Sequence, residues 1–199
     1  MSDKPQWLVR EDAGVPVLVA LALRQALGIR EPIDLPALRD RELRGPDAPE
    51  ASEALERQWL AYWEMTVEPV AHPAGGPLEL VDGFDTLVAL PVDGAEELRA
   101  AILPHAGSAV AYAKEVQAGY ARSITGGSDA YRAYAGAIAE FEREVGRRAH
   151  SFELNVHVLP LAQRGIWWIG ALSVAVTDGL RRDVVAFDTA IRPVIAELA

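Results

Sequence analysis

The sequence has no cysteine among its 199 residues, and this absence removes several kinds of chemistry at once. Disulfide bonds, thiolate nucleophiles, iron–sulfur clusters and cysteine-based zinc sites all need the thiol group. A chain of this length buries about 70% of the surface that it exposes when unfolded. The protein therefore needs no cross-link and no metal for stability, and the sequence predicts neither.

Positive charge and long apolar runs are also scarce. The chain has 19 Lys and Arg against 29 Asp and Glu, a net charge of −10, so it repels polyanions on average and no nucleic-acid partner is expected. The longest uncharged apolar runs, 15–23 and 166–176, are far shorter than the roughly twenty residues that span a bilayer. The first residues lack the basic and then apolar pattern of a signal peptide. We expect a soluble, cytoplasmic protein with no membrane partner.

The common catalytic and cofactor-binding motifs are absent as well. There is no HExxH, GxSxG or SxxK sequence and no phosphate-binding glycine motif. The four histidines, His72, His105, His150 and His157, include no pair with metal-binding spacing on one helix. The sequence thus predicts no metal and no cofactor, and it leaves open whether the protein is an enzyme.

What the sequence does contain is mostly helical periodicity. An apolar helix is expected to end at Gly28, where a glycine can take the left-handed conformation. Proline and glycine in 44–50 predict a linker or mobile loop. The fifth helix is expected to start at Ser128 and to bury Tyr131 and Val145. The predicted helices are 17–27, 50–67, 94–103, 108–122, Ser128 through Val145, and 180–198.

Strand signals are clearest near the C-terminus. Residues 151–159 alternate strictly between apolar and polar, and 166–176 is rich in aromatic and β-branched residues. A three-residue loop ending at Gly165 would pair these segments as an antiparallel hairpin, with Asn155 opposite Ser173. Asp82-Gly83 predicts a second hairpin near 78–90, a candidate for the same sheet.

These patterns together define the expected fold. The prediction is one helix-dominated α+β domain over 1–199, with a C-terminal antiparallel hairpin followed by a C-terminal helix. A doubly wound parallel sheet is not expected, because strands and helices do not alternate regularly along the chain.

The polar face of the predicted hairpin carries the candidate site. Glu153 and His157 are the catalytic candidates, with His157 as general base and Glu153 orienting it or sharing its proton. They lie four positions apart on one strand, about 13 Å, so a substrate would have to span them. Asn155 and Ser173 are ligand-binding candidates on the same face. The alternative is a strand surface that faces solvent, a helix or a second subunit.

A second ligand-binding candidate is Gly126-Gly127-Ser128, which precedes a helix. Backbone N–H groups at the start of a helix bind anions. The alternative is a helix end that runs directly into the cap of the next helix.

Two functions remain open at this level, and the absence of catalytic motifs favours the first. In the first, a non-catalytic binding or assembly protein presents a sheet face or aromatic patch to a partner or to a second copy of itself. In the second, a small-molecule enzyme or ligand-binding protein uses the polar face of the hairpin. Exposure of Tyr62 or Trp167 would favour the first function, whereas a concave pocket around a partly buried His157 would favour the second.

Overall fold

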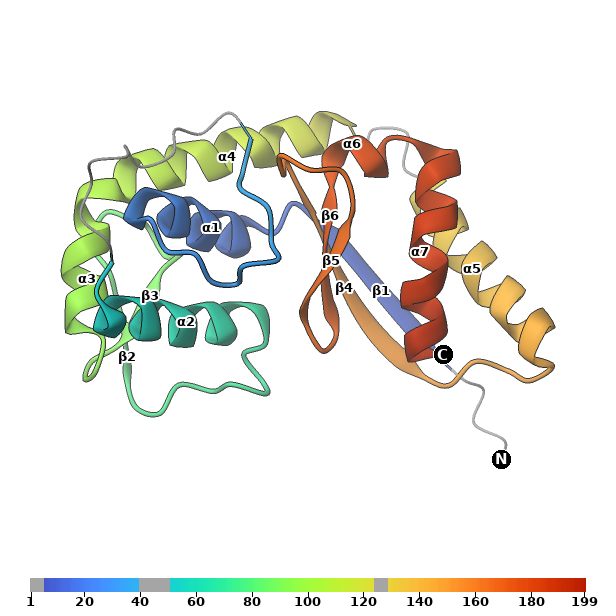
Figure 1. Ribbon diagram of the computed structural model, residues 1–199, viewed down its shortest axis with the longest axis horizontal. Coiled ribbons are helices and arrows are strands. Elements are labelled where there is room, and N and C mark those ends of the chain that lie inside the picture. Colours follow the sequence, from blue (N-terminus) through green and yellow to red (C-terminus); the bar gives the residue numbers. More distant parts are fainter. Residues whose placement is uncertain (1–5, 40–50, 124–128) are drawn as a thin grey trace.

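Figure 1 shows a computed structural model of the chain, which describes residues 6–39, 51–123 and 129–199. A mixed β-sheet stands beside a group of helices, and two further helices cover the other side of that sheet. The helix-rich α+β class is confirmed. The expected loop at 44–50 and the candidates Gly126, Gly127 and Ser128 lie outside the described residues.

The main sheet has four strands in the order β1-β4-β6-β5. β1 runs parallel to β4 and β4 runs parallel to β6, whereas β5 and β6 form an antiparallel hairpin. The strands are β1 (Trp7–Asp12), β4 (Phe152–Leu159), β5 (Ile166–Gly170) and β6 (Ser173–Thr177).

A C-terminal antiparallel hairpin is present, but the expected pairing of 151–159 with 166–176 as its two antiparallel strands was wrong. The segment 166–176 is itself the hairpin, and β4 pairs in parallel with its second half. Burial explains the difference. All five residues of β6 are buried, which suits a central strand covered on both faces, whereas β5 is only partly buried and lies at the edge. Asn155 and Ser173 are neighbours in both arrangements.

The second hairpin is also present, in a separate two-stranded sheet. It pairs β2 (Leu78–Leu80) with β3 (Ala89–Pro91), and Leu78 lies opposite Pro91. The turn is wider than the two residues Asp82-Gly83, because the connecting loop carries Phe84 and Val88 into the core, where both are fully buried. The cost of exposing these two side chains excludes the tight turn.

The helices match the periodicity of the sequence apart from one break. Gly28 ends α1 with a positive φ of 71°, as expected. The expected C-terminal helix is divided in two at Asp183, whose carboxylate accepts a hydrogen bond from the Ala186 N–H. The helices are α1 (Val15–Leu27), α2 (Glu53–Val67), α3 (Glu96–Ile102), α4 (Ala106–Ser123), α5 (Asp129–Val145), α6 (Asp178–Arg181) and α7 (Val184–Leu198), with a 3₁₀ turn at Leu103–His105.

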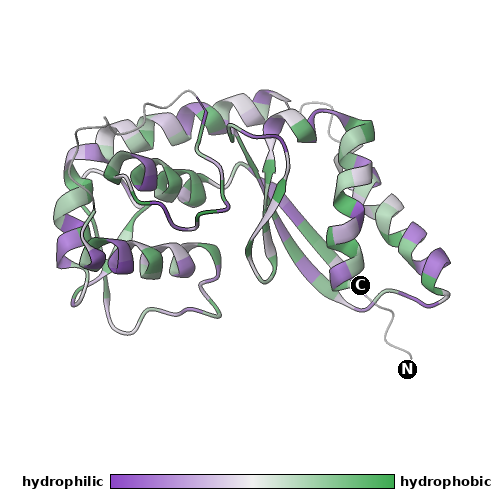
Figure 2. Ribbon diagram, viewed as in Figure 1, coloured by the Kyte–Doolittle hydropathy of each residue, from purple (hydrophilic) through white to green (hydrophobic). Residues whose placement is uncertain are grey.

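Two apolar clusters lie on opposite sides of the main sheet. α5 and α7 pack on one face, where Phe187 and Ile191 meet Val156 and Val174. The other cluster surrounds α1, which is green over nearly all of its surface in Figure 2, and it reaches the opposite sheet face at Ala175. Within the described ranges, no helix combines the length and the apolar character that a bilayer span requires.

The expected burial of Tyr131 and Val145 on α5 was wrong. These side chains are 62% and 50% exposed. α5 faces α7 and the sheet with Tyr134 and Ile138 instead, and the Tyr131 ring stacks on Trp7 at the surface with the ring centroids 5.2 Å apart. One face of an amphipathic helix suffices for this docking, so its remaining apolar residues stay in solvent.

Candidate functional site

The candidate site lies where β1 and β4 approach their carboxyl ends. The parallel register places Asp12 beside His157, and His157 Nδ1 lies 3.0 Å from Asp12 Oδ1. The His157 side chain is only 15% exposed, whereas that of Asp12 is 67% exposed. The imidazole is therefore mostly covered by protein, and the carboxylate is in contact with solvent. The carboxyl ends of parallel strands are where α/β sheets place their ligands.

The protonation of this pair follows from its hydrogen bonds. The bond from His157, together with one from the Gly14 N–H at 2.7 Å, holds the pKa of Asp12 below its ordinary value despite partial burial. Asp12 is therefore ionised at neutral pH, and a carboxylate can only accept. His157 Nδ1 must carry the proton, which leaves the lone pair of the neutral ring on Nε2.

Gly14 allows the imidazole to lie against the start of α1. Its φ is 55°, and a Cβ atom at this position would lie 2.8 Å from His157 Nδ1. Real Cβ atoms do not approach other atoms this closely. The chain turn that follows β1 is thus shaped around His157.

Replacing Gly14 by alanine is expected to lower the free energy of unfolding by about 2 kcal/mol, because left-handed strain adds to the contact with the imidazole. Gly94 offers a matched control, since its φ is 81° and no atom lies within 4 Å of the position of its Cβ. Urea unfolding should show a smaller loss for Gly94→Ala, which carries only the strain. Equal losses in the two variants would mean that the contact with His157 contributes nothing.

The other polar residues of this sheet face make separate pairs. Glu153 accepts a hydrogen bond from Arg10 at 2.6 Å, and both side chains are more than half exposed. Asn155 Nδ2 lies 3.5 Å from Ser173 Oγ, and the buried Ser173 hydroxyl donates weakly to the Val67 carbonyl. The structure therefore brings Asp12, not Glu153, to His157, because Glu153 lies four residues back on the same strand.

A second polar cluster surrounds Glu11, which points to the opposite face of the sheet. Its carboxylate accepts hydrogen bonds from the Tyr134 hydroxyl at 2.6 Å, the Tyr120 hydroxyl at 3.2 Å and Arg181 Nε at 2.8 Å. The Glu11 and Arg181 side chains are only 11% and 14% exposed. Arg181 also lies 4.5 Å from the centroid of the Phe187 ring, so two contacts fix its orientation.

The two tyrosines remain donors at every physiological pH. Burial, followed by the charge of Glu11, raises the pKa of both Tyr120 and Tyr134 above the ordinary value. The charge of Asp12 also raises the pKa of Tyr120, and that of Arg181 lowers it. Glu11 and Asp12 are adjacent residues at the end of β1, so the two clusters lie at the same end of the sheet, on its opposite faces.

Sequence reasoning missed Asp12 and the residues around Glu11. The partners come from β1, α4, α5 and α6, and none is close to another in sequence except Glu11 and Asp12. Residues 7–12 are three apolar residues followed by three charged ones, so the sequence has no alternation that marks Glu11 and Asp12 as the end of a strand. In the described part of the chain, no group of three or more His, Asp or Glu side chains is arranged to hold a metal ion.

Comparison with protein-family models, with curated proteins and with solved structures gives no match to this chain. The class of the protein is therefore described from its fold and its candidate site alone. It is a helix-rich α+β protein with a mixed sheet and an Asp–His pair near the carboxyl ends of two parallel strands.

Proposed function

We propose that the protein is an enzyme that acts on a small molecule, with His157 as its general base. The observation that carries this proposal is the bond from His157 Nδ1 to the ionised Asp12. It fixes the ring orientation and the tautomer, so that Nε2 is the basic atom. Asp12 does not react in this scheme, but stabilises the imidazolium that forms when His157 takes a proton.

Arg181 indicates an anionic group on the substrate, which would have to reach around the end of β1, because Arg181 lies on the opposite face of the sheet from His157. Its Nε is held by Glu11, and its two Nη nitrogens make no hydrogen bond or ion pair with the described residues. A guanidinium group fixed at Nε presents its two terminal nitrogens as a fork for a carboxylate or phosphate. Glu11 then acts as a positioning residue and Arg181 as the binding residue.

Burial of Tyr62 and of the tryptophans beside it weighs against an aromatic docking surface on α2, although Trp168 and Tyr131 are 38% and 62% exposed. Tyr62 is 4% exposed, and Trp59 and Trp63 lie in the same core. Trp167 packs against that core from β5. A partly buried His157 with a fixed partner favours proton transfer instead.

The test is a screen for reactions that need a general base on an anionic substrate. The probes are p-nitrophenyl phosphate, bis(p-nitrophenyl) phosphate and pyruvate, the last followed by exchange of its methyl protons in D₂O. We expect turnover of at least one probe, and a loss of about hundredfold or more in His157→Gln, because general bases contribute about 10² to 10⁴. Asp12→Asn should lower the rate and change its pH profile.

His150→Gln is the matched control, since His150 is exposed and its side chain makes no bond to the described residues. Its rate should equal that of the unaltered protein. Independently, the ¹⁵N shifts of the His157 ring should report a protonated Nδ1 and an unprotonated Nε2 at pH 8. Turnover that survives in His157→Gln, or a ring protonated at Nε2 alone, would refute the assignment of His157 as the base.

A further inference from the structure

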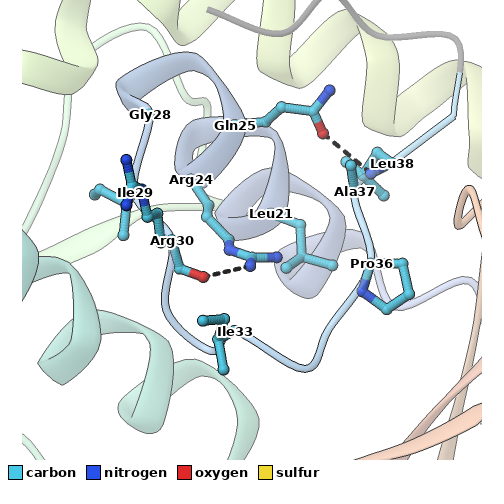
Figure 3. Close-up of a pocket in the computed structure, with 10 residues that line it drawn as sticks. All are labelled: Leu21, Arg24, Gln25, Gly28, Ile29, Arg30, Ile33, Pro36, Ala37 and Leu38. Atoms are coloured by element: carbon cyan, nitrogen blue, oxygen red, sulfur yellow. Dashed lines mark hydrogen bonds between the residues drawn. The ribbon is translucent and has the colours of Figure 1, made fainter. Parts of the chain in front are cut away.

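A cavity of about 440 Å³ lies between the C-terminal half of α1 and the segment 28–38. Figure 3 shows this segment curving around the cavity below α1, with the Arg24 side chain extending into the space that it encloses. The volume is in the range of small-molecule sites. Of the ten lining residues, two are arginines and none is a carboxylate, although the protein carries a net charge of −10. They are Leu21, Arg24, Gln25, Gly28, Ile29, Arg30, Ile33, Pro36, Ala37 and Leu38.

Arg24 holds the cavity wall by bonds to backbone carbonyls. Nη1 donates to the Leu35 carbonyl at 2.8 Å, and Nη2 donates to the carbonyls of Arg30 at 2.6 Å and Pro32 at 2.7 Å. Nε is buried and has no acceptor among the described residues. The guanidinium group is therefore fixed in place by neutral groups, and two of its five N–H donors, the one on Nε and one on Nη1, have no acceptor among the described residues.

The positive charge of Arg24 has no close counter-charge among the described residues, where it forms no ion pair. Glu31 is near enough for its charge to act on Arg24, but its exposed carboxylate accepts the Ile33 N–H instead. Burial lowers the pKa of Arg24, yet a guanidinium group does not lose its proton in proteins. A partly buried cation without a paired anion is unfavourable, and a bound anion would relieve that cost.

We propose that this cavity binds a small carboxylate with an apolar body, whose negative charge compensates Arg24. The apolar side chains of Leu21, Ile29 and Ile33 would cover the hydrocarbon part of the ligand. Ile33 is 73% exposed, so its side chain is accessible to a ligand in the cavity. The cavity lies along the C-terminal half of α1, about 10 to 20 Å from Gly14 along the helix axis, so it is separate from the Asp12–His157 pair.

The experiment compares benzoate with benzamide, which has nearly the same shape but no charge. Each is titrated into the full chain while the methyl resonances of Leu21, Ile29 and Ile33 are followed by NMR. We expect benzoate to shift these resonances and to bind at least about tenfold more tightly than benzamide. Hydrogen bonds from a guanidinium group to a carboxylate are charge-assisted and stronger than those to the neutral amide of benzamide. His157→Gln should bind benzoate unchanged, which separates this site from the proposed function.

Two variants keep the result interpretable. Arg24→Met should abolish the preference for benzoate over benzamide. Ile33→Ser removes only an exposed side chain, so it should leave the fold intact and weaken both ligands by a similar factor. Equal binding of benzoate and benzamide, a preference that persists in Arg24→Met, or an absence of shifts at these methyl groups up to about 10 mM ligand would overturn the proposal.

Discussion

Replacing Glu11 by glutamine is expected to lower the free energy of unfolding by about 3 kcal/mol or more. The Arg181 side chain would stay nearly buried but lose its counter-charge, and two tyrosine hydroxyls would lose a charged acceptor. Breaking a buried ion pair from one side typically costs about 3 to 5 kcal/mol. Urea unfolding followed by circular dichroism measures the change directly.

The matched control for this prediction is Glu153→Gln. Glu153, like Glu11, lies on a β-strand and accepts a hydrogen bond from an arginine. Its pair with Arg10 is more than half exposed, so it should contribute less than about 1 kcal/mol to the free energy of unfolding. The double variant Glu11→Gln with Arg181→Gln should recover part of the loss, because no unpaired charge remains. Similar losses for Glu11→Gln and Glu153→Gln would show that burial of the Glu11 pair does not determine its contribution.

Replacing Phe187 by alanine is expected to cost about 3 to 5 kcal/mol, the usual range for an aromatic residue removed from a core. Phe187 on α7 is fully buried, and its ring meets the edge of the Tyr134 ring with centroids 5.7 Å apart. It also supports the Arg181 guanidinium. The substitution would leave a cavity between α5, α7 and the sheet, and would remove one of the two contacts that orient Arg181, the proposed anion-binding residue.

Val185→Ala on the same helix is the control, since that side chain is 79% exposed and should change stability by less than about 0.5 kcal/mol. Phe187→Ala and Glu11→Gln should also be non-additive when combined, because both act through Arg181. Additive losses would contradict the coupling of Phe187 to the Glu11 cluster, and a loss no larger than that of Val185→Ala would contradict its place in the core.

Local signals predicted the helices better than the pairing of the strands. Helix α1 follows from an apolar run that ends at Gly28, and both features act within a few residues. The predicted pairing of β4 was wrong because it was argued from the next β-segment along the chain, whereas β4 pairs in parallel with β1 and β6. A parallel pair needs a long connection, and no local pattern shows which distant strand will lie alongside.

The candidate site divides in the same way. The alternation in 151–159 placed His157 on the polar face of a strand, and this position is a property of the sequence. Its partner Asp12 lies 145 positions away and meets it only through the parallel register of β1 and β4. The choice of Glu153 as partner failed because residues of one strand stay apart, whereas residues of adjacent strands come into contact.

The sequence by itself determined the α+β class, the helical segments and the absence of thiol chemistry, because these depend on composition and on periodicities of two or about 3.6 residues. Only the tertiary structure decided which carboxylate faces His157, which residues enclose Glu11, and that 28–38 folds over Arg24 to form a cavity. Burial of apolar faces from distant segments selected these contacts, and that selection acts on the whole chain at once.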